Sequence, residues 1–473
     1  MLNFNMTING QSVTSSNLLS VINPATEEVF ATCAIADKAT VDSAVEAARK
    51  AFKSWSSMPD TERAAKVASI AGILEQNMPE LMELVTKESG KPLGGLNGVG
   101  SGMEVGGSIA WTQATASFPL PVDIIQDDEV ATVEVHRKAL GVVASITPWN
   151  WPLMIAIWHV IPALRSGNTV VIKPASSTPV ATLRFVELVQ QVLPPGVLNI
   201  VIGGREVGHA LASHQDINKV VFTGSTNVGK GIMREASSNL KRLTLELGGN
   251  DAGIVLPGSN VEKIVPKLFG ASFHNNGHTC ACLKRLYVHE SQYEDICNGI
   301  AKLAKEVNVG NGLLDGTELG PIQNKAQLHS VKELIEDAVT HGATILAGGK
   351  EIEGKGYFHQ PTVVTNISDG VRLVDEEQFG PVIPIIKYSD LDEVITRSNN
   401  NENGLGGSIW GDDLELAKSV ALRMETGTVW INEHGALQPN APFGGVKQSG
   451  FGVEFGTYGL EEYVSLQTIK MSK

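Results

Sequence analysis

Between positions 141 and 249, five short apolar segments alternate with segments of helical pattern, and this alternation constrains the fold more than any other feature. One helix is expected from about Pro179, with serine and threonine before it as caps. Its apolar face would carry Leu183, Val186, Val189 and Leu193. Strands that are apolar throughout and joined by helices predict a parallel sheet covered on both faces. The five predicted strands are Gly141–Trp149, Asn168–Ala175, VLNIVIGG (197–204), INKVVFTG (217–224) and Arg242–Gly249.

The residues that follow these strands are the first candidates for a binding site. Ligands of open parallel sheets bind beyond the carboxyl ends of the strands. Here those ends would form a polar, glycine-rich rim of Pro148-Trp149-Asn150, Lys173-Pro174, Gly203-Gly204, Thr223-Gly224-Ser225 and Glu246-Leu247-Gly248.

Two other regions differ from this central series. A second strand-and-helix series starts near Asn250 and runs to about Gly445. The segment Ser117–Val142 alternates apolar and polar residues, as an antiparallel excursion would. The tail Glu461–Lys473 has a similar strand character. We expect these last two pieces to pair with each other or with another subunit.

Length and charge exclude several classes of protein. A chain of 473 residues indicates two or three domains. Its net charge of −14 gives a surface that repels nucleic acid and anionic lipid. No apolar run is long enough for a membrane span, the first residues lack a secretory signal, and four cysteines are too few for a disulfide framework. We therefore expect a cytoplasmic protein without nucleic-acid or membrane partners.

The stretch Phe273–Val288, FHNNGHTCACLKRLYV, holds the cysteines Cys280 and Cys282. Together with His274 and His278 they could supply four metal ligands. Structural zinc usually takes Cys-x2-Cys knuckles in pairs, however, and the remaining sequence has none, so no metal site is predicted. An inert buried thiol is the ordinary alternative, and we expect it for the three cysteines other than Cys280.

Cys280 lies in a polar, glycine-containing setting that favours a reactive thiol. A nucleophilic thiolate needs a lowered pKa or a nearby base, and its adduct needs oxyanion donors. Glu246 follows an apolar strand and precedes two glycines, where a surface salt bridge is poorly accommodated. Asn150 lies in a turn between two prolines. Alone, these two residues also fit a solvent-side glutamate and a simple turn former, but their combination with Cys280 indicates catalysis.

The chain resembles the aldehyde dehydrogenase superfamily in seven ordered motifs: ITPWNWPL, VIKPASSTP, FTGSTNVG, LELGGND, NNGHTC, EEQFGPV and PFGGVKQSGFGVEFG. The separation of Glu246 and Cys280, 280 − 246 = 34 residues, is also similar to that of the family. The resemblance implies an α/β fold of the aldehyde dehydrogenase type. It would have a Rossmann-type cofactor domain (1–116 and 139–248), a catalytic α/β domain (249–447) and a small β oligomerisation element (117–138 and 448–473). Homodimers or homotetramers would form through this element.

The resemblance also implies the catalytic roles. Cys280 would attack the aldehyde carbonyl, and the Asn150 side chain and the Cys280 backbone N–H would bind the oxyanion. After hydride transfer, Glu246 would activate the water that hydrolyses the thioester, and we expect burial to raise its pKa. The presence of Glu246 argues against the CoA-acylating or phosphorylating branch. A non-catalytic relative would tend to lack one of these three residues.

A dinucleotide cofactor, NAD and/or NADP, follows from the same resemblance. Ser176 stands where NAD-strict relatives often have a glutamate, so with Lys173 nearby we expect the 2′-phosphate of NADP to be accepted as well. The residues that match cofactor-binding positions are Ile146, Thr147, Pro148, Trp149, Lys173, Ser176, Gly204, Phe222, Gly224, Ser225, Val228, Gly229, Leu247, Glu377 and Phe379.

The substrate is expected to be an uncharged aliphatic or aromatic aldehyde, because the matching pocket positions are mostly apolar. They are Trp151, Met154, Ile155, Trp158 and His274. Alternatives are a succinate-semialdehyde or a betaine-aldehyde type of dehydrogenase. Cys282 is similar to the second cysteine of the former type, which raises the hypothesis of a regulatory Cys280–Cys282 disulfide. His278 replaces a common glutamine, and we expect a structural role for it.

Overall fold

The computed structural model describes all 473 residues, and its centre is an eight-stranded sheet. The order of its strands is β22-β12-β11-β8-β9-β10-β2-β3. The five central strands run parallel, which confirms the predicted parallel sheet. They are β8 (Val142–Ile146), β9 (Thr169–Lys173), β10 (Leu198–Ile200), β11 (Lys219–Thr223) and β12 (Arg242–Glu246). Antiparallel strands extend both edges: β22 (Gly450–Phe451), β2 (Met6–Ile8) and β3 (Gln11–Val13).

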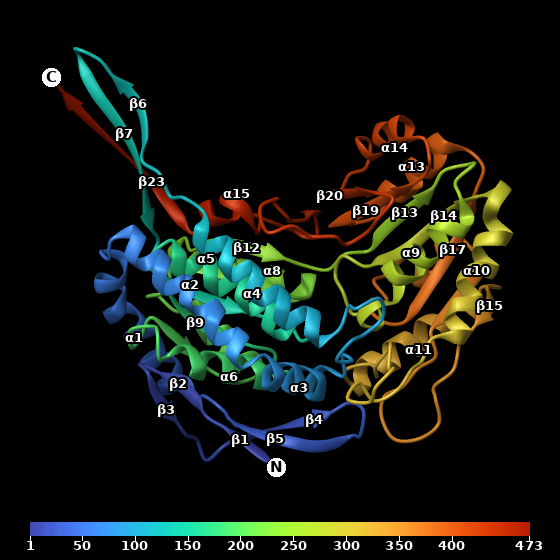
Figure 1. Ribbon diagram of the computed structural model, residues 1–473, viewed down its shortest axis with the longest axis horizontal. Coiled ribbons are helices and arrows are strands. Elements are labelled where there is room, and N and C mark those ends of the chain that lie inside the picture. Colours follow the sequence, from blue (N-terminus) through green and yellow to red (C-terminus); the bar gives the residue numbers. More distant parts are fainter.

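Helices connect the parallel strands and cover the sheet (Figure 1). The chain adds strands in one direction from β8 to β10 and in the opposite direction from β11 to β12. Because the crossovers are right-handed, the connecting helices then lie on opposite faces of the sheet. One face carries α5 (Pro152–Arg165) and α6 (Val180–Val189), and the other carries α7 (Arg205–Ser213) and α8 (Thr226–Ala236). Further helices pack around them: α1 (Lys38–Ser56), α2 (Asp60–Gln76), α3 (Met78–Ser89) and α4 (Ser101–Ser117). Together they bury one contiguous apolar core.

The start of α6 differs from its prediction. No serine or threonine caps the helix, whose N-cap residue is Pro179. The carboxylate of Glu88 on α3 instead accepts hydrogen bonds from the N–H groups of Val180 (2.6 Å) and Ala181 (3.1 Å). The helix also ends at Val189, so Leu193 is buried beyond it. A buried helix start can be capped from a distant segment, which a local sequence pattern does not reveal.

A seven-stranded sheet forms the second large unit, in the order β15-β16-β17-β14-β13-β19-β20. It begins at Asp251, which confirms the second series expected near Asn250. Its strands are β13 (Asp251–Val255), β14 (Leu283–His289), β15 (Thr344–Ala347), β16 (Thr362–Ile367), β17 (Val382–Tyr388), β19 (Gly406–Trp410) and β20 (Thr428–Ile431). Its helices are α9 (Val261–Phe273), α10 (Tyr293–Glu306), α11 (Lys325–Thr340), α12 (Arg372–Asp375), α13 (Leu391–Asn399) and α14 (Leu414–Ala421).

A three-stranded arm projects from the body of the molecule (Figure 1). It consists of β6 (Asp123–Asp127), β7 (Ala131–Ala139) and the C-terminal β23 (Val464–Ser472). Antiparallel pairing runs from Val464 opposite Ala139 to Ser472 opposite Ala131, so the two segments expected to pair do so within one chain.

Smaller elements complete the chain. A three-stranded sheet near the N-terminus is made of β1 (Leu2–Phe4), β4 (Leu18–Asn23) and β5 (Glu28–Ala34). A two-stranded sheet pairs β18 (Asn403–Gly404) with β21 (Val446–Lys447), and α15 (Gly456–Glu461) precedes the arm. None of the helices has the length and apolar character needed to cross a bilayer.

Candidate active site

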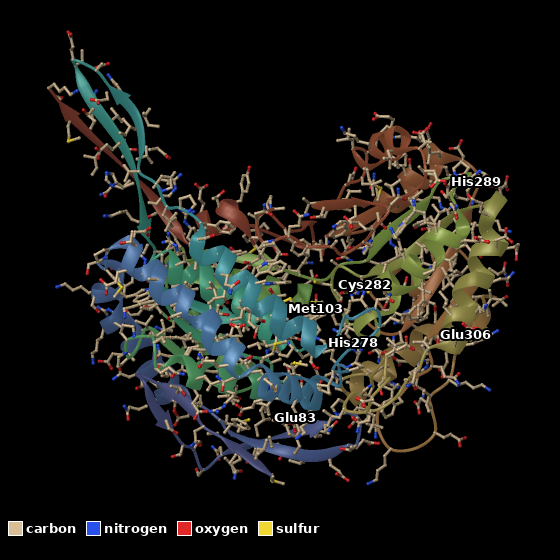
Figure 2. The ribbon with its side chains drawn as sticks, viewed as in Figure 1. Glu83, Met103, His278, Cys282, His289 and Glu306 are labelled. Carbon is tan, nitrogen blue, oxygen red and sulfur yellow. The ribbon has the colours of Figure 1, made fainter.

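The loop that carries Cys280 begins with a sharp reversal after α9. The 3₁₀ segment His274–Gly277 contains three successive residues in the left-handed region: Asn275 (φ 49°), Asn276 (φ 58°) and Gly277 (φ 70°). Asparagine and glycine tolerate this conformation better than other residues. The loop lies where the two large sheets approach each other, and Figure 2 shows the nearby His278 and Cys282 in the middle of the molecule. The turn therefore directs the chain from α9 back into β14 with Cys280 between them.

Asn150 is bonded directly to this loop. The side-chain Nδ2 of Asn150 donates to His278 O (2.9 Å). The backbone carbonyl oxygen of Asn150 accepts from Asn275 Nδ2 and from Lys91 Nζ (both 3.1 Å). Only one of the two hydrogens on Asn150 Nδ2 is used by the His278 bond. The other hydrogen is available for a ligand oxygen, so the structure brings the predicted oxyanion donor to the Cys280 loop.

A buried ion pair supports Asn150 from behind. Lys91 and Glu104 have no exposed side-chain surface and are bonded to each other. Glu104 Oε1 accepts from Leu153 N (2.9 Å) and Met154 N (3.2 Å) and so caps α5. Lys91 Nζ lies 3.3 Å from the ring centroid of Trp151. Lys91 and Glu104 were not predicted as site residues, because nothing in their local sequence pattern distinguishes them from surface residues.

Glu246 is the last residue of β12 and is buried. Neither of its carboxylate oxygens has a hydrogen-bond partner. Burial raises the pKa of Glu246 well above its usual value, and the nearby Glu454 and Glu462 raise it further. This confirms the expected direction of the shift. Glu454, a second buried carboxyl without partners, has its pKa raised to about 8 by burial.

Glycines allow the end of β12 and the Cys280 loop to pack closely. A Cβ added to Gly249 would lie 2.6 Å from Cys280 O. A Cβ added to Gly444 would lie 3.2 Å from Glu246 Oε1. The backbone three residues after Glu246 therefore packs against the carbonyl group of Cys280. The charge of Glu246 is also close enough to raise the pKa of the Cys280 thiol, so the predicted nucleophile and base lie near each other.

The thiol of Cys280 is protonated in this environment. Burial raises its pKa to about 12, although the positive charge of Lys284 opposes the shift. No base is hydrogen-bonded to the sulfur either. A nucleophilic thiol needs a lowered pKa or an adjacent base, and this structure provides neither. The proton must therefore leave as the reactants bind.

The second cysteine points away from the site. Cys282 is buried, and its Sγ donates to Ala271 O at 3.0 Å on α9. All four cysteines are free thiols, so the hypothetical Cys280–Cys282 disulfide is not formed in this structure. No group of three or more histidine, cysteine, aspartate or glutamate side chains is arranged to hold a metal ion.

His278 packs as an aromatic ring. Its ring centroid lies 5.1 Å from that of Trp149 and 6.2 Å from that of Phe379. Burial lowers the pKa of His278 to about 3, and Nε2 has no partner. Trp149 and Phe379 also contact each other (centroids 5.3 Å apart), so His278 is a neutral ring in a cluster of three, which agrees with a structural role.

The rim of the first sheet offers features that fit a dinucleotide. The N-cap of α8, Ser225, makes no side-chain cap bond, so the first N–H groups of this helix remain available for an anion. A Cβ on Gly224 would lie 2.5 Å from the Phe222 ring, and one on Gly229 would lie 2.6 Å from the Leu247 side chain. At both positions a larger residue would clash with these side chains, so only glycine allows the start of α8 to pack this closely against β11 and the segment after β12.

The two polar residues predicted for the ribose end lie beside this rim. Lys173 ends β9, and its Nζ donates to Pro174 O (3.1 Å). Burial lowers the pKa of Lys173 to about 8. Ser176 Oγ donates to Gly203 O (2.9 Å), next to Gly204 at the start of α7. Strand β8 ends at Ile146, and Thr147, Pro148 and Trp149 come directly after it. Val228 is exposed in the first turn of α8.

Glu377 and Phe379 come from the second large unit and reach the same rim. Glu377 Oε1 accepts from Gly249 N and from Lys284 Nζ, both at 3.1 Å. Lys284 Nζ also lies 4.4 Å from the centroid of the Phe379 ring. The structure thus places both residues beside the Cys280 loop, between the two sheets.

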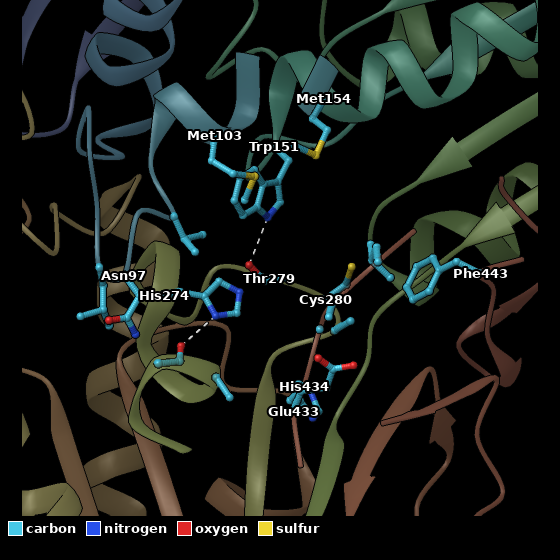
Figure 3. A pocket seen from close by; sticks show the side chains of 18 of the residues that line it. Asn97, Met103, Trp151, Met154, His274, Thr279, Cys280, Glu433, His434 and Phe443 are labelled. Atoms are coloured by element: carbon cyan, nitrogen blue, oxygen red, sulfur yellow. Dashed lines mark hydrogen bonds between the residues drawn. The ribbon is translucent and has the colours of Figure 1, made fainter. Parts of the chain in front are cut away.

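A cavity of about 560 Å³ opens onto Cys280 (Figure 3). All five predicted pocket residues line it, from Trp151 to His274. Trp151 Nε1 donates to Thr279 Oγ1 at 3.1 Å. Several lining residues were not predicted because they come from distant segments, namely Asn97, Met103, Trp111, Lys267, Glu433, His434, Leu437 and Phe443.

Aromatic side chains make up one wall of this cavity. The Trp158 centroid lies 4.8 Å from that of Phe455 and 5.9 Å from that of Trp111. Such clusters bury large apolar surfaces and favour apolar ligands. The cavity therefore suits an aromatic or aliphatic molecule whose reactive carbon reaches Cys280.

Comparison with known proteins gives one consistent result. The sequence model of the Aldehyde dehydrogenase family matches residues 11–469. A phenylacetaldehyde dehydrogenase from Pseudomonas fluorescens is 38% identical over 98% of this chain and 95% of its own. The structure of an NAD+ complex of a Bacillus cereus aldehyde dehydrogenase has a TM-score of 0.96 and 36% identity, over 99% of this chain and 96% of that one. An NADP-dependent enzyme from E. coli has a TM-score of 0.96 and 31% identity, over 100% of this chain and 98% of that one.

Proposed function

Since the chain belongs to the aldehyde dehydrogenase family, we propose that it oxidises an aldehyde to the free carboxylic acid with NAD+ or NADP+ through a covalent intermediate on Cys280. The observation that carries this proposal is that the amide of Asn150 and the carboxyl of Glu246 both lie close to Cys280, which itself lines the cavity. Cys280 lines an apolar pocket, the Asn150 amide is bonded to its loop, and the charge of Glu246 is close enough to raise the pKa of the Cys280 thiol.

The first step is the attack of Cys280 Sγ on the carbonyl carbon, which forms a C–S bond and turns the carbonyl oxygen into an oxyanion. The free hydrogen on Asn150 Nδ2 and the Cys280 N–H would donate to that oxyanion. Because burial raises the pKa of the thiol, its proton would pass to water in the cavity as the C–S bond forms.

The cofactor would lie along the rim of the first sheet. Its pyrophosphate would bind at the uncapped start of α8 beside Gly224 and Ser225, and Lys173 and Ser176 would contact the adenine ribose. Glu377 and Phe379 would orient the nicotinamide end beside Cys280. When bound, NAD+ or NADP+ supplies the hydride acceptor that converts the thiohemiacetal into a thioester.

Hydrolysis of the thioester is the role of Glu246. As a carboxylate it would take a proton from water, the resulting hydroxide would attack the acyl carbon, and the sulfur of Cys280 would leave. Burial raises the pKa of Glu246, which makes its carboxylate a stronger base. A buried base next to the nucleophile favours water over CoA as the acyl acceptor and supports a free acid as the product.

The apolar wall of Trp111, Trp151 and Trp158 favours an uncharged aromatic or aliphatic aldehyde. The similarity to a phenylacetaldehyde dehydrogenase supports an aldehyde that contains an aromatic ring. Neither Trp158 nor His274 supplies the cation that a succinate semialdehyde would require. For the cofactor, Ser176 carries no carboxylate that would repel a 2′-phosphate, so we expect both NAD+ and NADP+ to be used.

The domains and the assembly of the protein are also part of this proposal. We assign cofactor binding to residues 1–116 and 139–248, catalysis to 249–447, and self-association to the arm and the C-terminal segment, 117–138 and 448–473. The open edges and exposed apolar residues of the arm support a homodimer or homotetramer.

The test of the proposed function is the replacement Cys280→Ala, with Cys282→Ala as the matched control. NAD(P)H absorbance with a panel of aldehydes should show a loss of turnover of at least about 10⁴-fold for Cys280→Ala, because the covalent route is closed. Cys282→Ala should retain activity, since its thiol faces α9. Turnover of Cys280→Ala close to that of the wild type would refute the covalent route.

A further inference from the structure

The ring of His274 lies on the wall of the cavity and exposes one nitrogen to it. Nδ1 is hydrogen-bonded to Gly270 O at 2.9 Å. A carbonyl oxygen can only accept, so the hydrogen of the ring is on Nδ1. Burial lowers the pKa of His274 to about 4, and the ring is therefore neutral at pH 7. Nε2 is left as an acceptor, and Figure 3 shows that this nitrogen faces the cavity.

The surrounding wall does not satisfy this acceptor. The indole N–H of Trp151 is used by Thr279 Oγ1 (3.1 Å), and Lys267 Nζ donates to Asn432 O (3.1 Å). The indole nitrogens of Trp111 and Trp158 are buried within the protein and do not reach the surface of the cavity. A ligand without a donor would cover Nε2 and leave it unpaired, at a cost in binding free energy.

We propose that His274 selects aldehydes whose apolar body carries a neutral hydrogen-bond donor, a hydroxyl or an N–H, that donates to Nε2. This inference rests on the proposed aldehyde oxidation and specifies its substrate class. The carbonyl group would lie at Cys280, the body against the tryptophan wall, and the donor at His274.

A cationic head group is the main competing ligand. The exposed carboxylate of Glu433 lies at the same cavity, and aromatic rings attract cations. A quaternary ammonium group has no N–H or O–H, however, and would bury Nε2 without a partner. The neutral acceptor on the wall therefore favours a hydroxyl-bearing aldehyde over a betaine-type aldehyde.

The experiment compares matched substrates. The ortho, meta and para hydroxymethylbenzaldehydes carry a neutral donor at three positions, and their methyl ethers keep the oxygen but lack the donor. In the wild type, kcat/KM for at least one alcohol should exceed that for its ether by roughly 3- to 10-fold, the range expected for one neutral hydrogen bond. In His274→Phe this ratio should fall to about 1. Since both substrates are measured on the same variant, the ratio cancels any general change in the enzyme.

A second histidine provides the control. His289 at the end of β14 packs against Tyr388 (centroids 5.4 Å apart), away from the cavity, so His289→Phe should keep the wild-type ratio. In His274→Gln the amide oxygen can accept a hydrogen bond, so this variant should regain part of the alcohol-to-ether ratio that His274→Phe loses. A ratio near 1 in the wild type, an unchanged ratio in His274→Phe, or a preference for betaine aldehyde over every alcohol would overturn the inference.

Binding measurements separate this inference from the proposed function. The corresponding methyl ketones have no hydride to lose, so titration calorimetry can compare alcohol and ether ketones without turnover. A failure to oxidise any aldehyde would contradict the proposed function, whereas the calorimetric ratio would still decide the role of His274. Equal affinities of the wild type for alcohol and ether ketones would reject it.

Discussion

At the scale of single residues, the isolation of Glu246 gives the clearest kinetic prediction. Its carboxylate has no hydrogen-bond partner, so Glu246→Gln should alter the chemistry of the site more than its packing. Formation of the acyl-enzyme should persist while its hydrolysis slows by about 10²- to 10⁴-fold, the usual contribution of a general base. Stopped-flow absorbance should then show a burst of NAD(P)H of about one equivalent per site, followed by slow turnover. A variant without a burst, or with wild-type steady-state turnover, would contradict this role.

The neighbouring carboxyl of Glu454 predicts a pH effect on stability. Burial raises its pKa from 4.5 to about 8. The folded state therefore binds an extra proton between these values, and this contribution to stability is lost as the pH rises through about 8. Relative to Glu454→Gln, the free energy of unfolding of the wild type should fall between about pH 5 and pH 8, by at most about 1.4 kcal/mol per pH unit. Urea denaturation of both proteins across this range measures the difference, and a difference independent of pH would argue against the shift.

Single residues also show what the sequence could predict about the site. Cys280, Asn150 and Glu246 lie in ordered motifs that resemble those of the aldehyde dehydrogenase family, and the sequence predicts them as a combination rather than one by one. Lys91 and Glu104 do not stand out, because a buried charge is recognisable only through the distant partners that surround it. The high pKa of the Cys280 thiol likewise depends on burial by the whole fold.

At the scale of elements, the apolar strands were predictable and the helix starts were not. The five central strands follow from continuous apolar runs, which only a sheet covered on both faces can bury. By contrast, α5 and α6 are capped by Glu104 and Glu88, which come from other helices. Long-range caps of this kind leave no signal beside the helix that they stabilise.

The cap of α5 predicts that the Lys91–Glu104 pair positions Asn150. The double substitution Lys91→Met with Glu104→Gln keeps an acceptor oxygen for the cap, leaves no unpaired buried charge and removes the Lys91 bond to Asn150 O. We expect kcat to fall by roughly 10- to 100-fold with a smaller change in KM, because a displaced oxyanion donor weakens binding of the transition state more than of the ground state. Steady-state kinetics measure kcat and KM, and circular dichroism shows whether the variant is folded.

An ion pair at the other end of α5, with one buried and one partly exposed side chain, provides the control. Arg165 Nη2 donates to Asp60 Oδ2 at 2.9 Å, and Arg165 is buried. The double substitution Arg165→Met with Asp60→Asn should lower stability while leaving kcat close to that of the wild type. If both double variants lose activity equally, the Lys91–Glu104 pair supports only the fold.

At the scale of the whole molecule, the cavity was the least predictable feature. Its wall combines residues from α4, α5, α9 and the loops that follow α9 and β20, which lie more than three hundred positions apart in the sequence. The pattern of each segment predicts its own helix or strand, but the meeting of the segments depends on how the two large sheets pack. The sequence therefore predicted five pocket residues from one segment and the Cys280 loop, and missed Trp111, Leu437 and Phe443.

The arm predicts how whole molecules associate. Both of its outer strands, β6 and β23, have an open edge, and Leu466 on β23 is 67% exposed while Ile125 on β6 is 68% exposed. Exposed apolar residues beside an open edge are stabilised when a second subunit covers them. We expect Leu466→Glu with Ile125→Glu to lower the mass measured by light scattering after size exclusion, because burial of the two new charges is unfavourable. Leu240→Glu is the control, since Leu240 is 89% exposed on a turn after α8, outside the arm. An unchanged mass for the arm variant, or an equal loss of mass in Leu240→Glu, would show that subunits do not associate through this arm.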